Sequence, residues 1–338
     1  MVLTLLACQA VEPEHIDSAG GGLMFRGFIE LPGAMDVTGQ GDIAVLAGGE
    51  NPLVDVLIAD VSEPSEPLTL ATIEGLDETR DVHLEGDVLY TAHDTGSISV
   101  RIWDLSDPSD PTLLSVVEQD RRAHNLHVGG GHLYVANREE KRVGIYDVSD
   151  PSDPAYVGGW SPPVGGVHDQ TWAEDRLYVT GHFGFAVLDV SDPGSAQTLY
   201  EWLAPGPQDY VHSLWPAQGG RYVLTTHEVL GAGLRVFDLE AGPAEVTRWP
   251  EVDSNCAHNV VVRGDQAFVA WFIEGLKVVD ISDPTAPEGI GAYDTWEPAR
   301  VEDPGSCDLS GAFGVWPLDE RILLGDESGL WIFELEPE

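Results

Sequence analysis

The 338-residue sequence has very little positive charge. It contains 16 Lys+Arg against 58 Asp+Glu, a formal net charge of −42, and its only lysines are Lys141 and Lys277. A surface of this charge repels nucleic acid and anionic lipid, so we expect no nucleic-acid partner. It suits high salt, divalent cations or a cationic partner. Because the acidic residues are spread along the chain, a solvated, salt-tolerant surface is the simplest interpretation.

Long apolar runs and common catalytic signatures are also missing. Beyond the first residues, no segment is long and apolar enough to cross a membrane as a helix, and no apolar pattern of helical period is sustained. The sequence has no Gly-rich phosphate loop, no CxxC pair, no HExxH and no nucleophile elbow. These absences leave the corresponding chemistry poorly supported. Paired carboxylates are not diagnostic in so acidic a chain.

What the sequence does contain is a repeated acidic phrase with two prolines. It reads YDVSDPSDP at Tyr146–Pro154, and near copies end at Pro67, Pro111, Ser195 and Pro287. The Asp after each apolar run recurs at steps of 44, 43, 42, 49 and 42 residues, as Asp60, Asp104, Asp147, Asp189, Asp238 and Asp280. A near-constant period of about 43 residues indicates stacked or radial repeats.

Each repeat reads as four short β-strands. In Ala123–Pro154 an apolar run is followed by a Gly-rich turn, the run HLYVAN, a loop and the run VGIYDV. A fourth run, AYVGGW, comes after the proline phrase. Runs rich in Val, Ile, Tyr and Leu and bounded by Gly, Asp and Pro are typical of strands. Four strands in about 40–45 residues is the size of one propeller blade.

The proline phrase itself is predicted to be a turn. Its Asp and Ser side chains supply acceptors for turn amides, and its prolines cannot lie inside a strand ladder. The alternative is a calcium- or ligand-binding motif. We interpret the phrase as the corner that links the third and fourth strands of each blade.

Counting repeats predicts a closed ring. Units begin near Ala34, Arg80, His124, His168, His212, His258 and Phe313. The last unit stops after its third strand, and Leu23–Gly33, before the first unit, resembles the missing fourth strand. An N-terminal strand that completes the C-terminal blade leaves no open sheet edge. We therefore predict an all-β, seven-bladed β-propeller of four-stranded antiparallel blades over residues 23–338, and expect a monomer.

The repeats also resemble a known family. VGIYDVSDPSDPAYVGG, VLDVSDP and VVDISDP are similar to the LVIVD repeat family of bacterial and archaeal envelope proteins. The resemblance covers nearly all of Leu23–Glu338, although the fifth unit, with VFDLEAGPAE, and the seventh depart from the pattern. It implies a β-propeller outside the cytoplasm, in the cell envelope or extracellular. It implies no particular reaction.

The N-terminal residues resemble a shortened lipoprotein signal. LLAC at Leu5–Cys8 is similar to a bacterial lipobox, in which the Cys is lipidated after cleavage before it. MVLTLLA lacks the basic start and the full apolar stretch of a secretory signal, so either the true start lies upstream or the match is accidental. Gln9–Gly22 is polar and suits a tether. We expect residues 1–22 to be a truncated signal and tether, with lipidated Cys8 as the only membrane attachment.

The two remaining cysteines fall in the loops that enter the last two blades. Cys256 and Cys307 are therefore candidates for neighbours on one face of the ring. A disulfide between them fits an oxidising compartment. Two free thiols, or metal ligation by Cys256 beside His258, are the alternatives, because spacing alone does not show distance.

Histidines form the most specific chemical pattern. Aligning the units on their second strands gives a column that reads Ala34, Arg80, His124, His168, His212, His258 and Phe313. The next column is mostly small and polar and reads Met35, Asp81, Asn125, Asp169, Ser213, Asn259 and Gly314. A second set, His93, His182 and His227, follows the second strand. Because the first strand of an antiparallel blade starts where the second finishes, we expect both sets on one face, with the four-His column at the channel mouth.

Two interpretations of the four-His column compete. Duplication copies a structural residue into every repeat, so each His could simply hydrogen-bond loop backbone at a blade entrance. Alternatively His124, His168, His212 and His258 hold a transition metal such as copper or zinc, because clustered imidazoles are how such sites are built. The absence of His from three of the seven blades favours a function, since a purely structural His should appear in all.

We therefore expect an extracytoplasmic propeller that binds a protein or small-molecule ligand on its His-rich face. The main alternative is a copper- or zinc-dependent enzyme that uses the same face. A calcium-dependent, lactonase-like hydrolase is a third hypothesis, since Asp81, Asn125, Asp169 and Asn259 offer oxygen ligands in the channel. The fold alone does not choose among them.

Overall fold

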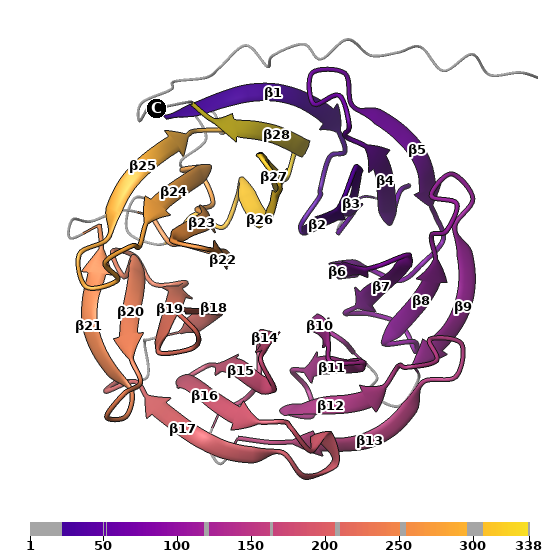
Figure 1. Ribbon diagram of the computed structural model, residues 1–338. Coiled ribbons are helices and arrows are strands. Elements are labelled where there is room, and N and C mark those ends of the chain that lie inside the picture. The colour runs from indigo at the N-terminus through magenta and orange to yellow at the C-terminus, as the bar shows by residue number, and fades with distance from the viewer. Residues whose placement is uncertain are drawn as a thin grey trace, which may run out of the picture.

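The protein is a ring of seven β-sheets around a central channel (Figure 1). A computed structural model describes residues 22–49, 51, 53–117, 122–162, 165–206, 210–250, 255–295 and 307–336. Each sheet has four antiparallel strands. The predicted all-β, seven-bladed propeller is therefore confirmed. No helix among the described residues is long and apolar enough to cross a membrane.

The first four blades follow one another along the chain. Blade 1 consists of β2 (Val37–Gln40), β3 (Ile43–Ala47), β4 (Val56–Asp60) and β5 (Leu68–Ile73). Blade 2 consists of β6 (Thr79–Glu85), β7 (Val88–His93), β8 (Val100–Asp104) and β9 (Thr112–Val117). Blade 3 consists of β10 (Asn125–Gly129), β11 (His132–Asn137), β12 (Arg142–Asp147) and β13 (Ala155–Trp160). Blade 4 consists of β14 (Gln170–Ala173), β15 (Arg176–Gly181), β16 (Gly184–Asp189) and β17 (Gln197–Leu203), with the 3-10 helix η1 (Pro193–Ser195) before its last strand.

The last three blades complete the ring. Blade 5 consists of β18 (Val211–Ala217), β19 (Tyr222–His227), β20 (Leu234–Asp238) and β21 (Ala244–Trp249). Blade 6 consists of β22 (Val260–Arg263), β23 (Gln266–Ala270), β24 (Leu276–Asp280) and β25 (Glu288–Tyr293). Blade 7 consists of β26 (Ala312–Leu318), β27 (Arg321–Asp326), β28 (Gly329–Leu335) and, from the other end of the chain, β1 (Leu23–Glu30).

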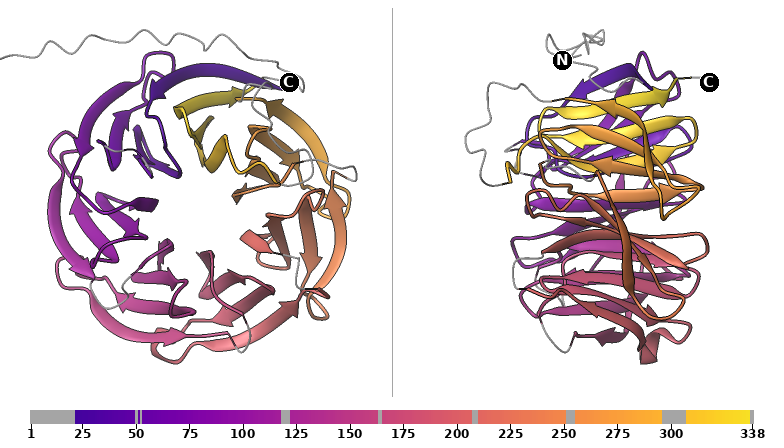
Figure 2. Two further views of the ribbon diagram at one scale, coloured as in Figure 1. Left: turned by 180° about the vertical axis from the view of Figure 1, so that it is seen from behind. Right: turned by 90° about the vertical axis from the view of Figure 1, so that its left-hand side faces the viewer.

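The N-terminal strand closes the ring as predicted. β1 pairs antiparallel with β28, from Leu23 opposite Leu335 to Glu30 opposite Gly329. Both strands lie at the outer circumference of the ring, where their pairing joins the two ends of the chain, as Figure 2 shows from behind and edge-on. Without β1, the backbone groups of β28 would form an open sheet edge.

The proline phrases are corners, as predicted. Each phrase lies between the third and fourth strands of its blade, for example between β12 and β13. The Oδ1 atom of Asp147 accepts a hydrogen bond from the amide of Ser149 at 2.9 Å. The same bond recurs at Asp60, Asp104, Asp189 and Asp280. The repeated Asp therefore fixes a turn by accepting the amide two residues later.

The core lies between neighbouring blades. Within β11, Leu133–Ala136 consists only of apolar and aromatic residues, because both faces of this strand are buried. Its Tyr134 and Ala136 pack with Leu177 and Val179 of blade 4 in one apolar cluster. The outermost strands, such as β13, are largely exposed.

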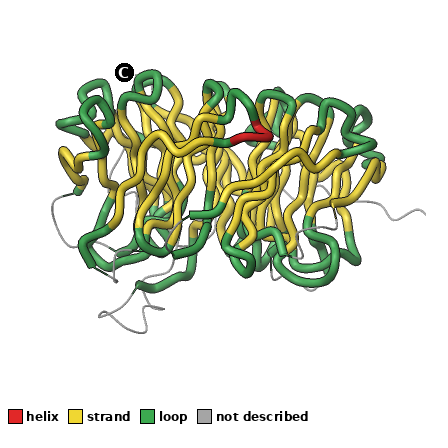
Figure 3. The backbone as a smooth tube through the Cα atoms, turned by 90° about the horizontal axis from the view of Figure 1, so that it is seen from below, coloured by secondary structure: helices red, strands yellow, loops and turns green. Residues whose placement is uncertain are grey.

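The two rims of the ring carry different parts of each repeat. In the edge-on view of Figure 3, η1 marks the rim that carries the proline corners. Antiparallel order places the starts of the first strands and the ends of the second strands on the opposite rim. The candidate site lies at that opposite rim.

Candidate metal and ligand site at the channel mouth

A cavity of about 410 Å³ opens at one end of the channel. All four residues of the predicted column line it: His124, His168, His212 and His258. Arg138 and Glu228 line it as well. This volume is that of a small-molecule pocket. We call this region the channel mouth.

The four histidines form a continuous row across four blades. His124, His168 and His258 lie one or two residues before β10, β14 and β22, and His212 is the second residue of β18. Successive ring centroids are 4.5, 4.3 and 3.8 Å apart along the row. The sequence alignment therefore selected side chains that the fold does bring together.

Three of the four rings are fixed by the next blade. The Nδ1 atom of His168 lies 3.3 Å from the carbonyl oxygen of His212, and that of His212 lies 3.2 Å from the carbonyl oxygen of His258. His258 Nδ1 reaches the carbonyl of Phe313 at 2.7 Å. A carbonyl oxygen only accepts, so each Nδ1 carries the proton and donates. The lone pair of each neutral ring is therefore on Nε2.

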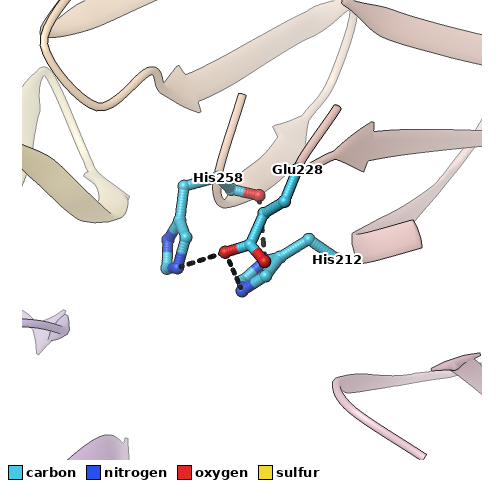
Figure 4. A group of neighbouring side chains, drawn as sticks. All are labelled: His212, Glu228 and His258. Carbon is cyan, nitrogen blue, oxygen red and sulfur yellow. Dashed lines mark hydrogen bonds and ion pairs between the residues drawn. The ribbon is translucent and has the colours of Figure 1, made fainter. Parts of the chain in front are cut away.

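Glu228 faces two of these Nε2 atoms, as Figure 4 shows. Its Oε1 atom lies 3.6 Å from His212 Nε2 and 4.0 Å from His258 Nε2. One ligand atom from each of the three residues lies within 4.8 Å of the others. Both distances are too long for hydrogen bonds, and with the protons on Nδ1 all three facing atoms are acceptors. We call His212, Glu228 and His258 the triad.

Burial keeps the row neutral. It lowers the pKa of His212 to about 3, with smaller contributions from electrostatic interactions with His124 and Arg138. Burial also holds the pKa values of His168 and His258 well below their usual value. Neutral imidazole is the form that binds a metal ion, so these rings need not lose a proton to do so.

His124, at the other end of the row, has a different environment. Its Nδ1 is 3.1 Å from Asp94 Oδ2 rather than near a carbonyl, and the guanidinium of Arg138 lies 3.4 Å from its ring nitrogens. Burial raises the pKa of Asp94, but the hydrogen bond from His124 and the electrostatic interactions with His124, Arg80 and Arg138 together outweigh it and leave that pKa lowered. A carboxylate and a guanidinium thus surround His124, which is not part of the triad.

The three histidines of the second predicted set do not occupy one position of the repeat, so the sequence alignment was wrong here. His93 and His227 are fully buried inside blades 2 and 5, where their Nε2 atoms each lie 2.9 Å from a threonine hydroxyl, on Thr91 and Thr225. They do not line the mouth. His182 does lie at this rim, with its ring centroid 4.9 Å from that of Tyr210.

Strand register explains the error. Val88, His132, Arg176, Tyr222 and Gln266 each pair with the repeated Asp of the neighbouring strand. Counting six residues on from each of these gives Asp94, Arg138, His182, Glu228 and Phe272. His182 therefore occupies the same repeat position as Glu228. His93 and His227 share the position one residue earlier in the repeat. We call this set the mouth-facing column, because its members contact or line the mouth and its chemistry changes from blade to blade.

A second polar layer lies deeper in the channel, and we call it the throat. Val82 N donates to Asp36 Oδ2, Leu126 N to Asp81 Oδ2, and Gln170 N to Asn125 Oδ1, each bond crossing to the next blade. These bonds place Asp36, not Met35, in the predicted small polar column of blade 1. The throat then consists of Asp36, Asp81, Asn125, Asp169, Ser213 and Asn259, which line a cavity of about 50 Å³.

Burial dominates the electrostatics of the throat. It raises the pKa of Asp169 to about 7 and raises those of Asp36 and Asp81. The Asp36 and Asp81 side chains also hydrogen-bond each other, which further raises the pKa of Asp81. Below the throat, His83, His127, Trp215 and Trp316 contact one another in an aromatic floor.

The cysteine pair lies beside the mouth. Cys256 and Cys307 form a disulfide with a Cα–Cα distance of 5.5 Å. Cys256 also packs with Phe272 and Phe313, whose rings flank His258. Cys8, the predicted lipidation site, lies outside the described residues.

A family model identifies the repeats. A family model described as LVIVD repeat matches residues 78–118, 120–160 and 256–295, in blades 2, 3 and 6. The protein is a seven-bladed propeller with LVIVD repeats. None of the curated proteins matches this LVIVD-repeat propeller in sequence.

Solved structures share the fold of the LVIVD-repeat propeller at low identity. The WD40 repeats of RRP9 superimpose with a TM-score of 0.69 and 9% identity, over 95% of this chain and 100% of that one. A Bacteroides uniformis protein described as a candidate 6-phosphogluconolactonase gives 0.62 and 13%, over 76% and 83%. The computationally designed Ika8 protein gives 0.61 and 10%, over 94% and 100%. At such identities the likeness shows the fold alone.

Proposed function

We propose that this LVIVD-repeat propeller is a binding module whose channel mouth holds a divalent transition metal ion, zinc or copper. The ligands are Nε2 of His212, Nε2 of His258 and the carboxylate of Glu228. The ion is the first part of a binding site that also takes a small-molecule or protein ligand.

One observation carries the proposal. In the triad two lone pairs and a carboxylate oxygen face one another, and the backbone carbonyls on the far side of the rings hold the protons away. Three acceptors turned toward one point repel each other unless a cation lies between them. A carbonyl that fixes the Nδ1 proton is also the usual second partner of a metal-binding histidine.

The spacing of the triad fits zinc. Zinc bonds of about 2.0–2.1 Å in tetrahedral geometry separate ligand atoms by about 3.4 Å. The Glu228 oxygen is 3.6 and 4.0 Å from the two nitrogens, so small side-chain movements would close the set. Two imidazoles and one glutamate are also a known donor set for zinc with an open coordination position.

The open position supports the alternative of a metal-dependent enzyme. Structural zinc sites are closed by four protein ligands, whereas catalytic sites keep a position for water or substrate. The triad supplies three ligands and faces a cavity of about 410 Å³. The binding module and the enzyme share this metal site, and only turnover separates them.

The calcium-dependent hydrolase is the less favoured hypothesis. Oxygens of Asp36, Asp81 and Asn125 already accept backbone amides from the next blade. Burial raises the pKa of Asp36, Asp81 and Asp169, which favours neutral carboxyl groups over the anions that calcium requires.

We also propose that the protein acts outside the cytoplasm, in the cell envelope. The Cys256–Cys307 disulfide suits an oxidising compartment. The formal net charge of −42 suits an exposed, solvated surface. Lipidation at Cys8 remains the proposed anchor, and Cys8→Ser in a chain with a complete signal should release the protein from membranes.

Elemental analysis tests the metal site. Protein stripped with chelator, reloaded with zinc or copper and dialysed should retain one ion per chain. His212→Ala and Glu228→Gln should lose it. His132→Ala is the matched control, since His132 is a surface histidine that does not line the cavity and bonds only the carbonyl of Gly130 in the described chain. Retention of one ion by both triad variants would reject the site.

A further inference from the structure

We infer that Arg138 is the carboxylate-binding group of the channel mouth, and that the cavity takes a small dicarboxylic acid between Arg138 and the triad metal. One carboxylate would pair with the guanidinium and the other would fill the open metal position. This inference rests on the proposed function. It assigns the chemical class of the ligand, which the metal site alone does not.

Arg138 differs from most arginines in the described part of this acidic chain in forming no direct ion pair with a carboxylate. Arg101 pairs with Asp77 at 3.2 Å, and Arg221 pairs with Asp238 at 3.1 Å. Among the described residues Arg138 forms no ion pair, and its polar contacts are with the neutral ring of His124. The nearby carboxylate, Asp94, is bound to Nδ1 of the His124 ring and forms no direct ion pair with the half-buried guanidinium. The guanidinium is therefore prepared for an anion from outside the chain.

The position of Arg138 is set by the repeat. It belongs to the mouth-facing column, whose members in blades 3, 4 and 5 are Arg138, His182 and Glu228. All three lie at the same rim. Arg138 lies at the His124 end of the histidine row and Glu228 at the His212–His258 end.

The charges at the mouth leave room for an anion. Arg80 is paired with Glu78, and Asp94 is bound to His124. The triad brings one carboxylate, Glu228, to meet a divalent ion. Glu327 also lines the cavity. A divalent ion and Arg138 would still offer an anion two separate cationic groups, and Arg is well suited to hold a carboxylate in a bidentate manner.

The walls of the cavity match the middle of a dicarboxylic acid. Met35, Phe272 and Phe313 line the same cavity, and Phe272 and Phe313 are buried against His258. An apolar wall in a cavity that also holds two cationic groups accepts methylene groups flanked by two carboxylates. A monocarboxylate of similar size would leave either the guanidinium or the metal unmatched.

Titration calorimetry with unbranched dicarboxylates tests the inference. Malonate, succinate, glutarate and adipate would be titrated into zinc-loaded protein at constant ionic strength, with succinamide as the uncharged probe. One chain length should bind best, because it matches the distance from the metal to the guanidinium. Arg138→Gln should weaken that binding at least ten-fold, Arg138→Lys less, and zinc affinity should stay within two-fold. Arg142→Gln is the control, because Arg142 is in the same blade but pairs with Glu140 and does not line the cavity.

The outcomes separate the two proposals. Zinc binding with no dicarboxylate binding, or with binding that Arg138→Gln does not change, would overturn the inference and leave the metal site standing. Dicarboxylate binding that depends on Arg138 but is equally tight without zinc would overturn the bridging arrangement. Failure of zinc to bind at all would overturn the proposed function, and with it the metal half of this inference.

Discussion

The mouth and the throat of the channel are neighbouring layers of the same repeat. Their side chains bond the next blade in opposite senses, as donors in the mouth and as acceptors in the throat. In both layers a side chain from one blade bonds the backbone of the next. In the mouth, His168, His212 and His258 donate from Nδ1 to a carbonyl. In the throat, Asp36, Asp81 and Asn125 accept from an amide. The two layers therefore join the blades in the same way.

The difference lies in what remains after that bond is made. An imidazole has a second nitrogen, so the histidines that join the blades still turn Nε2 toward the cavity. The carboxyl groups of the throat are buried, which raises their pKa values and favours their protonated forms, and they bond their neighbours. The structural and metal-binding interpretations of the histidines are thus compatible, because each uses a different ring nitrogen.

The largest expected difference between mouth and throat is in metal affinity. Glu228→Gln should weaken zinc binding by about 100-fold or more, since loss of a ligand exceeds the 10–100-fold cost of losing an outer partner. Asp81→Asn in the throat should leave zinc affinity within two-fold. Isothermal titration of zinc into both variants measures this. Equal losses in the two would mean that the mouth is not the metal site.

Stability should respond in the reverse order. Asp81→Ala leaves the buried amide of Leu126 without its acceptor, which costs about 1–3 kcal/mol. His168→Ala should cost less, because the carbonyl of His212 also accepts from Thr180 Oγ1 at 2.7 Å. In thermal melts each kcal/mol corresponds to about 2–4 °C. A larger drop for His168→Ala than for Asp81→Ala would contradict this ranking.

Acidification of the metal-free protein should affect the two layers with opposite sign. The raised pKa of Asp169, about 7, gives stability that is complete below its unfolded value of 3.8 and is lost as pH rises through 7. The lowered pKa of His212, about 3, gives stability that is complete above 6.5 and is lost as pH falls toward 3. Each group contributes at most about 1.4 kcal/mol per pH unit.

Urea unfolding between pH 4 and 8 measures both signs. Asp169→Asn should remove the part of the curve that falls with rising pH. His212→Asn should remove part of the loss on the acid side. If both substitutions changed the pH dependence in the same direction, the distinction between a protonated throat and a neutral mouth would be wrong.

The fold was predictable because the same succession of strands and turns recurs in the seven repeats. The Asp of YDVSDPSDP at Asp147 recurs with a near-constant period, and the missing strand of the last blade is visible at Leu23–Gly33. The four-His row was predictable for the same reason, since repeated positions come together in a closed ring. A register error of one residue leaves these conclusions unchanged.

Predicting the residues of the site required the exact register between neighbouring strands, which the sequence pattern did not supply. Bulges interrupt the pairing near Thr79, Val211 and Ala312, at the starts of first strands. The sequence alignment also placed His182 with His227 instead of Glu228, and Met35 in the position of Asp36. Glu228 and Arg138 were missed because neither belongs to a repeated residue type. Counting six residues from the position that pairs with each repeated Asp would have found both.

X-ray absorption at the zinc edge tests the central claim most directly. Zinc-loaded protein should show imidazole scattering from two histidines and light-atom ligands at about 2.0–2.1 Å, and Glu228→Gln should change the oxygen shell while keeping both imidazoles. Such a spectrum would place the ion on His212, His258 and Glu228. A first shell with sulfur, or with no imidazole, would contradict the claim that the free Nε2 atoms of the mouth exist to hold a metal.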